Sequence, residues 1–130
     1  MATEFSVTLS DAPGRLAHLG QVLGDARVNI EAIFGVAREG EGLVRFVPDN
    51  TATATRALEA AHLRYAVREV VVVRVLDTPG ALGELALVMA KAGINIDSIY
   101  VTTHGSLVLG VDDLHGAIQV AGGMAVMVDR

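Results

Sequence analysis

The sequence predicts an α+β protein built from two copies of one βαββαβ unit. Three observations lead to this prediction. One segment recurs 66 positions further along the chain, which is the sign of an internal duplication. Within each copy, apolar residues alternate as they do in strands or recur at helical spacing. No linker separates the two copies, so the second is expected to follow the first directly.

The duplication is clearest at the start of each copy. Residues 9–33 and residues 75–99 align without a gap, and 10 of the 25 positions are identical. Chance would give roughly one or two identities at ordinary residue frequencies. The repeat therefore divides the chain into residues 1–69 and residues 70–130. The identical pairs are Asp11/Asp77, Pro13/Pro79, Gly14/Gly80, Leu16/Leu82, Leu19/Leu85, Val22/Val88, Ala26/Ala92, Asn29/Asn95, Ile30/Ile96 and Ile33/Ile99.

The first copy shows the expected periodicities in order. Its strands have alternating apolar residues, and its first helix has one apolar face. Proline is well placed at a first helical position, where its missing N–H costs nothing. The expected elements are a strand through Phe5–Leu9, a helix from Pro13, a strand from Val28 towards Val36, a turn at Glu39–Gly42, a strand from Leu43, a helix capped by Asn50 or Thr51, and a strand from Ala66.

The second copy repeats this order with a tighter hairpin at His104–Gly105. Asp112 and Asp113 are expected to cap its last helix, and Asp49 stands at the corresponding point of the first copy. Each copy should form an antiparallel sheet with both helices on one face. The expected elements are Val70–Leu76 (strand), Pro79–Ala92 (helix), Ile94–Thr102 and Leu107–Val111 (strands), Leu114–Ala121 (helix) and Ala125–Val128 (strand).

Residues 65–77 contain no proline, glycine or serine. Thirteen extended residues exceed the usual strand length of about five or six. The last strand of copy one is therefore expected to run almost directly into the first strand of copy two.

Composition excludes several classes of function. The net charge is −5 and the chain has one lysine, Lys91, which argues against nucleic-acid binding. No apolar stretch is long enough for a membrane span, and residues 1–11 do not resemble a signal peptide, so a cytoplasmic location is expected. Cysteine is absent, and the four histidines lack metal-ligand spacing. No catalytic motif is recognisable, so we expect neither an enzyme nor a cofactor.

The motif D-x-P-G-x-L, followed fifteen residues after its glycine by the asparagine of (V/I)-N-I, occurs in both copies. This pattern resembles the ACT domain, a ferredoxin-like βαββαβ module that binds amino acids and regulates metabolic enzymes. The resemblance covers the whole chain and implies a free-standing protein with two ACT modules in tandem. It also implies an amino-acid site where two modules meet, a homodimer, and a metabolic enzyme or regulator as partner. The family usually has glycine before the (V/I)-N-I segment, as at Gly93, whereas copy one has Arg27.

The resemblance implies that the first-helix turn of one module and the second-strand start of another form the ligand site. Helix-opening N–H groups suit a carboxylate, an aspartate suits an ammonium group, and an asparagine can do both. Copy one has Arg27 where the family usually has glycine. The part of the site around the asparagine is therefore expected to be better preserved in copy two. The implied ligand-binding residues are Asp11, Ala12, Gly14, Arg15, Leu16, Asn29 and Ile30 in copy one, and Asp77, Thr78, Gly80, Ala81, Leu82, Asn95 and Ile96 in copy two.

Each of these residues also has a structural interpretation. The aspartates could only brace their turns, the asparagines could only adopt turn conformations, and the leucines and isoleucines could belong to the core. A second functional hypothesis is a ligand-free assembly or regulatory subunit that dimerises through the same modules.

Overall fold

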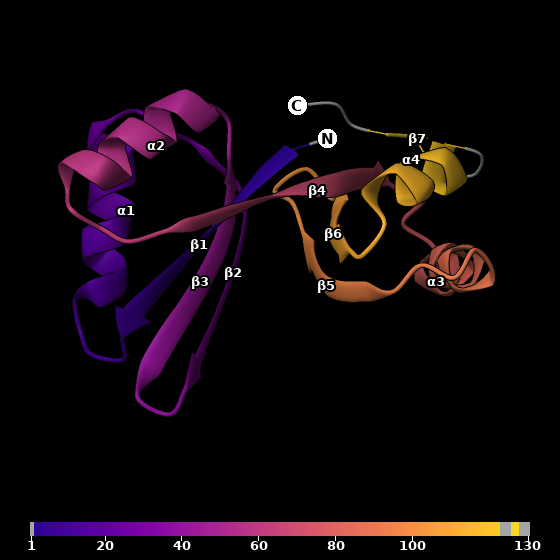
Figure 1. Ribbon diagram of the computed structural model, residues 1–130, viewed down its shortest axis with the longest axis horizontal. Helices are drawn as coiled ribbons and strands as arrows, with labels where there is room; N and C mark the ends of the chain where they lie inside the picture. The colour runs from indigo at the N-terminus through magenta and orange to yellow at the C-terminus, as the bar shows by residue number, and fades with distance from the viewer. Residues whose placement is uncertain (1, 123–125, 128–130) are drawn as a thin grey trace. The chain divides into compact units, whose positions relative to one another are not determined.

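The computed structural model describes residues 2–122 and 126–127 (Figure 1). The chain divides into two compact units, with the boundary between Arg68 and Glu69. The first unit comprises Thr3–Arg68, and the second comprises the residues from Glu69 onward together with Ala2. Both combine strands with helices, and every strand pairing described below is antiparallel, so the predicted α+β class is confirmed.

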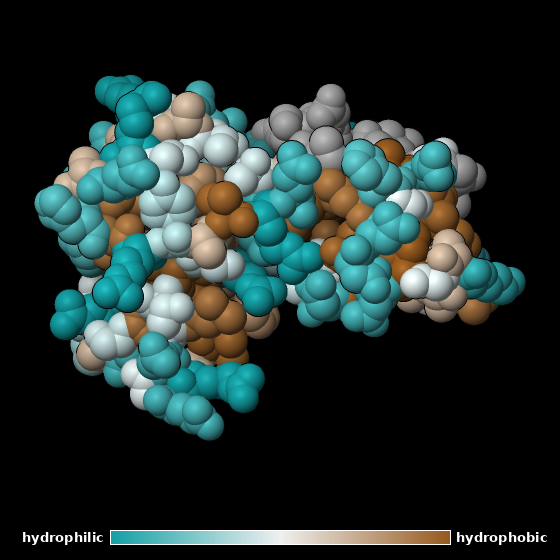
Figure 2. Space-filling view, in the orientation of Figure 1, coloured by the Kyte–Doolittle hydropathy of each residue, from teal (hydrophilic) through white to brown (hydrophobic). Residues whose placement is uncertain are grey.

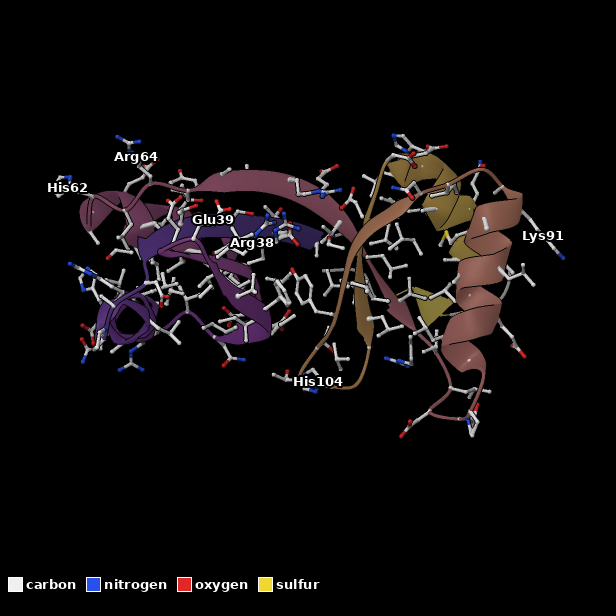
Figure 3. All side chains as sticks on the ribbon, turned by 90° about the horizontal axis from the view of Figure 1, so that it is seen from below. Arg38, Glu39, His62, Arg64, Lys91 and His104 are labelled. Atoms are coloured by element: carbon white, nitrogen blue, oxygen red, sulfur yellow. The ribbon has the colours of Figure 1, made fainter. Side chains whose placement is uncertain are left out.

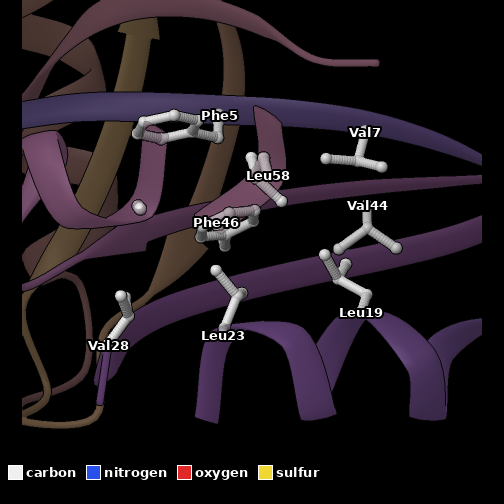
Figure 4. Close-up of a cluster of buried hydrophobic side chains, with 9 residues drawn as sticks. Phe5, Val7, Leu19, Leu23, Val28, Val44, Phe46 and Leu58 are labelled. Carbon is white, nitrogen blue, oxygen red and sulfur yellow. The ribbon is translucent and has the colours of Figure 1, made fainter. Parts of the chain in front are cut away.

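The first unit has its two helices on one face of its sheet. Its elements are β1 (Ala2–Ser10), α1 (Arg15–Asp25), β2 (Ile30–Arg38), β3 (Glu41–Pro48) and α2 (Thr51–Ala60), followed by the start of β4 (Ala66–Arg74). The strand order is β2-β3-β1-β4, which leaves β2 at the edge. Phe5 and Phe46 stack with ring centroids 5.3 Å apart. Leu19 and Leu23 of α1 and Leu58 of α2 pack into the same core (Figure 4).

The second unit has the same arrangement. After β4 come α3 (Ala81–Lys91), β5 (Ile96–Val101), β6 (Leu107–Val111), α4 (Leu114–Gly122) and β7 (Val126–Met127). The strand order is β4-β6-β5, with β5 at the edge, and β7 pairs with β4. Leu85 and Met89 of α3 and Ala117 of α4 pack against Val71 and Leu109 of the sheet.

Strand β4 crosses the boundary between the units without a break. The predicted continuous strand at the junction is therefore present, but it ends at Arg74, two residues before the predicted end at Leu76. Other boundaries also differ. β2 begins at Ile30 rather than Val28, and β3 already includes Glu41. Of the predicted strand Ala125–Val128, Val126 and Met127 are strand, and its two end residues lie outside the described residues.

Candidate functional site

A Pro-Gly turn leads into the first helix of the first unit. Gly14 has φ 88° and ψ −12°, which is the conformation of the third residue of a type II turn. The Arg15 N–H donates to the Ala12 carbonyl at 3.3 Å and closes the turn. Pro13 therefore occupies the second turn position, and the prediction that it opens the helix is wrong. The helix begins at Arg15, because a left-handed residue cannot be part of it.

The second unit repeats this turn. Gly80 has φ 89° and ψ −10°, and the Ala81 N–H donates to the Thr78 carbonyl at 3.2 Å. Pro79 again lies in the turn, and α3 begins at Ala81. The D-x-P-G motif thus encodes a left-handed glycine immediately before a helix.

These turns leave backbone N–H groups free at the start of each helix. In α1, the Arg15 N–H is used by the turn, and the His18 N–H donates to the Gly14 carbonyl at 3.0 Å. The N–H groups of Leu16 and Ala17 have no acceptor in the described part of the chain, and no side chain caps the helix. α3 shows the same pattern. Two adjacent free N–H groups at a helix N-terminus can donate hydrogen bonds to a carboxylate.

The two aspartates of the motif do not brace these turns. Asp11 and Asp77 are both exposed. Neither carboxylate has a hydrogen bond or ion pair among the described residues, and only the backbone N–H of Asp11 is engaged, with the Gly40 carbonyl at 3.0 Å. Both carboxylates are therefore available to a cationic group.

The two asparagines are fixed by aspartates that sequence reasoning assigned differently. The Asn95 N–H donates to Asp112 Oδ1 at 3.0 Å, and the Asp112 N–H donates to the Asn95 carbonyl at 3.2 Å. Asn29 and Asp49 make the same pair of bonds, at 3.0 and 2.9 Å. The prediction that Asp112 caps the last helix is wrong, because its carboxylate is used by Asn95. Its neighbour Asp113 does accept from the Gly116 N–H at 3.0 Å.

The helix α2 of the first unit is capped in the same manner. Asn50 Oδ1 accepts from the Thr53 N–H at 2.9 Å, so Asn50, rather than Thr51, is the cap. In each unit the residue just before the cap therefore holds an asparagine backbone, and the side-chain amides of Asn29 and Asn95 have no partner among the described residues. The signal in the sequence was the pair of polar residues, 49–50 and 112–113, before each second helix.

Arg27 does not disturb the geometry around Asn29. Arg27 has φ 61° and Gly93 has φ 73°, so both adopt the left-handed conformation. Val28 N–H donates to the Leu23 carbonyl at 2.9 Å, and the equivalent bond of Ile94 measures 3.0 Å. The expectation that copy two has the better preserved asparagine side is therefore not supported by the backbone.

A pocket of about 270 Å³ lies beside the first turn of α1. Four of the predicted site residues line it: Asp11, Ala12, Arg15 and Leu16. The ends of three strands form the rest of its wall, through residues 9–10, 35–37 and 42–44. Apolar side chains dominate the wall, and one acidic and one basic side chain accompany them. Like the Asp11 carboxylate, the Arg15 guanidinium has no partner among the described residues.

The other predicted residues lie elsewhere. Asn29 precedes the start of β2, whereas the pocket reaches the end of that strand at 35–37. Gly35 lies six positions after Asn29 along the strand, about 20 Å at about 3.3 Å per residue. Ile30 and Ile96 pack against the cores of their units. Leu16 and Leu82, in contrast, are 59% and 52% exposed.

The remaining polar groups form no recognisable catalytic or metal centre. Among the described residues, no cluster of three or more histidine or acidic side chains could hold a metal ion. His62 and His104 lie at exposed turns in different units (Figure 3). Tyr65 donates to Glu59 Oε2 at 2.7 Å, and this bond raises the pKa of Tyr65 above 10.0. None of the helices within residues 2–122 is long and apolar enough to cross a membrane.

The turn, the free N–H groups and the asparagine–aspartate pair recur in the same order in both units. Residues 70–118 match the ACT domain family. The match to the ACT domain runs from β4 into α4 and lies in the second unit. No curated protein matches the chain.

Solved structures resemble the chain over nearly its whole length. A protein from Bacteroides thetaiotaomicron has a TM-score of 0.88 at 21% identity, covering 97% of this chain and 92% of that protein. The regulatory subunit of aspartate kinase from Thermus thermophilus, in a ligand-free form, has a TM-score of 0.70 at 20% identity, covering 93% of this chain and 90% of that subunit. The regulatory subunit of aspartate kinase from Thermus flavus has a TM-score of 0.69 at 18% identity, covering 94% of this chain and 90% of that subunit. At these identities the similarity establishes the fold, an α+β arrangement of the ferredoxin-like kind found with ACT domains.

Proposed function

We propose that the protein is a non-catalytic regulatory protein of the cytoplasm that binds a free amino acid through two tandem ACT modules, residues 1–69 and 70–130. The observation that supports this most is the unpaired aspartate beside two free helix N–H groups, found at the same place in both units. The match of residues 70–118 to the ACT domain supports the same function.

The proposed contacts follow from the chemistry of a zwitterion. The ligand carboxylate would accept from the free N–H groups at the start of α1 or α3. The ligand ammonium group would donate to Asp11 or Asp77, in a charge-assisted hydrogen bond. The amide of Asn29 or Asn95 can donate and accept, and its backbone is already fixed, so little order has to be gained on binding.

A second module is needed to complete such a site, because Asn29 lies about 20 Å along β2 from the pocket of its own unit. We propose that a homodimer supplies it. Within the described residues, β2 and β5 are the edges of the strand order. Both edge strands carry exposed apolar side chains: Ile33 and Val36 on β2, and Ile99 and Val101 on β5. Apolar side chains are also visible among polar ones on the surface of each unit (Figure 2). Unpaired apolar edges favour association.

Ligand binding would be passed on as an allosteric signal. A ligand held by two modules stabilises one arrangement of them, and coupling of about 1–3 kcal/mol is typical. The recipient would be a metabolic enzyme or regulator. Two of the structural relatives, which are regulatory subunits of aspartate kinase, support an enzyme as partner.

A thermal-shift screen against the twenty common amino acids tests this function. A ligand at about 100 times its dissociation constant adds about 2.7 kcal/mol of stability, which is readily seen. We expect one amino acid, or a few of similar shape, to raise the melting temperature. The shift should weaken in Asp11→Ala, in Asp77→Ala or in both, according to which unit binds the ligand, and persist in Asp113→Ala, which removes only a helix cap.

The alternative function, a ligand-free assembly subunit, is supported by the same apolar edges. It predicts a dimer whose melting temperature responds to no amino acid. Mass spectrometry of the purified, dialysed protein separates the two functions, because a retained amino acid excludes the alternative.

A further inference from the structure

The pocket of the first unit exists because small residues line its strand side. Gly35, Ala37 and Gly42 stand where larger side chains would fill it. Gly35 lies opposite Val44, whose side chain belongs to the core on the helix face. A Cβ added at Gly35 would therefore point to that face, and it would meet nothing nearer than the Leu43 carbonyl oxygen and Val44 Cγ2, both at 3.9 Å. The position has room for a side chain that the sequence does not supply.

The second unit has a valine at this position. Val101 lies 66 positions after Gly35, so the two residues are equivalent in the repeat. Val101 pairs with Leu107 on β6, as Gly35 pairs with Val44 on β3. Its side chain is 59% exposed. A branched side chain thus stands where the first unit has only space.

The two units also differ in charge. In the first unit, Asp11 and Arg15 both line the pocket, and neither side chain has a partner among the described residues. The equivalents in the second unit are Asp77 and Ala81, so the basic group is missing there. A guanidinium binds a carboxylate with two parallel hydrogen bonds, so the first unit alone offers charged partners for both ends of a zwitterion.

We propose that the first unit is the ligand-selective site and that it takes an α-amino acid with an aliphatic side chain, with Gly35 as the residue that determines side-chain size. This inference rests on the proposed amino-acid binding. Leu9 and Leu16 offer the side chain apolar walls. The pocket volume is about 270 Å³. It lies just below the roughly 300–1,000 Å³ of sites for drug-sized ligands.

The test compares the affinity and stoichiometry of aliphatic amino acids (alanine, valine, leucine, isoleucine and methionine) by titration calorimetry on the full-length protein. We expect one site per chain in the wild type and a preference for the larger aliphatic side chains. Gly35→Val, which copies the second unit, should weaken binding of the preferred ligand by about 10- to 200-fold. Gly35→Ala should have a smaller effect and a relative gain for the smallest ligand.

Two further variants complete the design. Asp113→Ala, which removes only a helix cap in the second unit, should leave the affinity unchanged. Arg15→Ala should lower the affinity for every aliphatic amino acid by roughly 10- to 100-fold, as expected for a lost hydrogen bond to a charged group. Melting without ligand checks folding: Gly35→Val should melt no lower than wild type, because valine favours strands and the added atoms have space.

The outcomes separate the two levels of the proposal. Wild-type binding that is unaffected in Gly35→Ala and in folded Gly35→Val overturns the assignment to the first unit and leaves amino-acid binding intact. Absence of binding by any of the twenty amino acids overturns both. If Gly35→Val does not fold, the graded response of Gly35→Ala across the ligand series decides.

Discussion

One substitution made at two glycines of the second unit tests the backbone geometry of the candidate site. Gly93 is left-handed, with φ 73°, and lies two residues before Asn95, whereas Gly83 lies inside α3. A Cβ at either glycine would meet no atom within 4 Å. Collision with neighbours is therefore excluded at both, and only the backbone conformation distinguishes them.

The expected effects have opposite signs. At Gly93, alanine costs about 1–2 kcal/mol in left-handed strain and recovers about 0.4–1 kcal/mol by restricting the unfolded chain, a net loss of about 1 kcal/mol. At Gly83, alanine gains about 0.8–1 kcal/mol of helix propensity. The two variants should thus differ by about 2 kcal/mol in the free energy of unfolding. Each should shift the melting temperature by about 4 °C, in opposite directions.

Urea and thermal unfolding followed by circular dichroism measure these changes. The first unit provides the reverse experiment. Arg27→Gly should stabilise the protein by up to about 1 kcal/mol, because it relieves the strain at φ 61°. Arg27→Ala retains that strain and serves as its control. If Gly93→Ala stabilises as Gly83→Ala does, the left-handed conformation at this position is wrong.

Three other predictions concern individual contacts. Asp112→Ala removes the acceptor of the Asn95 N–H and should cost about 0.5–1.5 kcal/mol, measured by urea unfolding; an unchanged midpoint would contradict the contact. Tyr65 has its pKa raised mainly by its bond to Glu59, so the neutral form is favoured in the folded state. The stabilisation it provides is present below pH 10 and is lost as the pH rises through the raised pKa. Ultraviolet titration should show Tyr65 ionising at lower pH in Glu59→Gln, and an unchanged titration would refute the bond's role. Ile33→Lys places a charge on the exposed β2 edge and should shift sedimentation towards the monomer, whereas an unaltered dimer would place the interface elsewhere.

The sequence was sufficient to predict the α+β class because the periodicities within each copy are local signals. It predicted the α+β class, the continuous strand at the junction and the position of the first helices to within two residues. The misplaced start at Pro13 has a physical cause. The fixed φ of proline fits both the first helical position and the second position of a type II turn. The two positions differ only in the left-handed conformation of Gly14, which follows the proline. Glycine adopts positive and negative φ values alike, so the sequence does not predict its conformation.

The site was less accessible to sequence reasoning because its contacts are not local. Asn29 is held by Asp49, 20 residues away, and a run of polar residues before a helix suggests capping more readily than such a contact. The pocket could not be predicted either, because it depends on a missing side chain. Gly35 lies in a strand whose pattern indicates only burial and pairing, and the space appears once α1 and the sheet are in place.

The central claim, that this protein binds a free amino acid, is tested most directly by equilibrium dialysis. The protein is dialysed against an equimolar mixture of the twenty common amino acids, and both compartments are quantified by mass spectrometry. Binding predicts that one or a few aliphatic amino acids are enriched on the protein side, and that the enrichment falls in Asp11→Ala. Equal concentrations of all twenty amino acids in the two compartments, at protein concentrations well above micromolar, would contradict the claim.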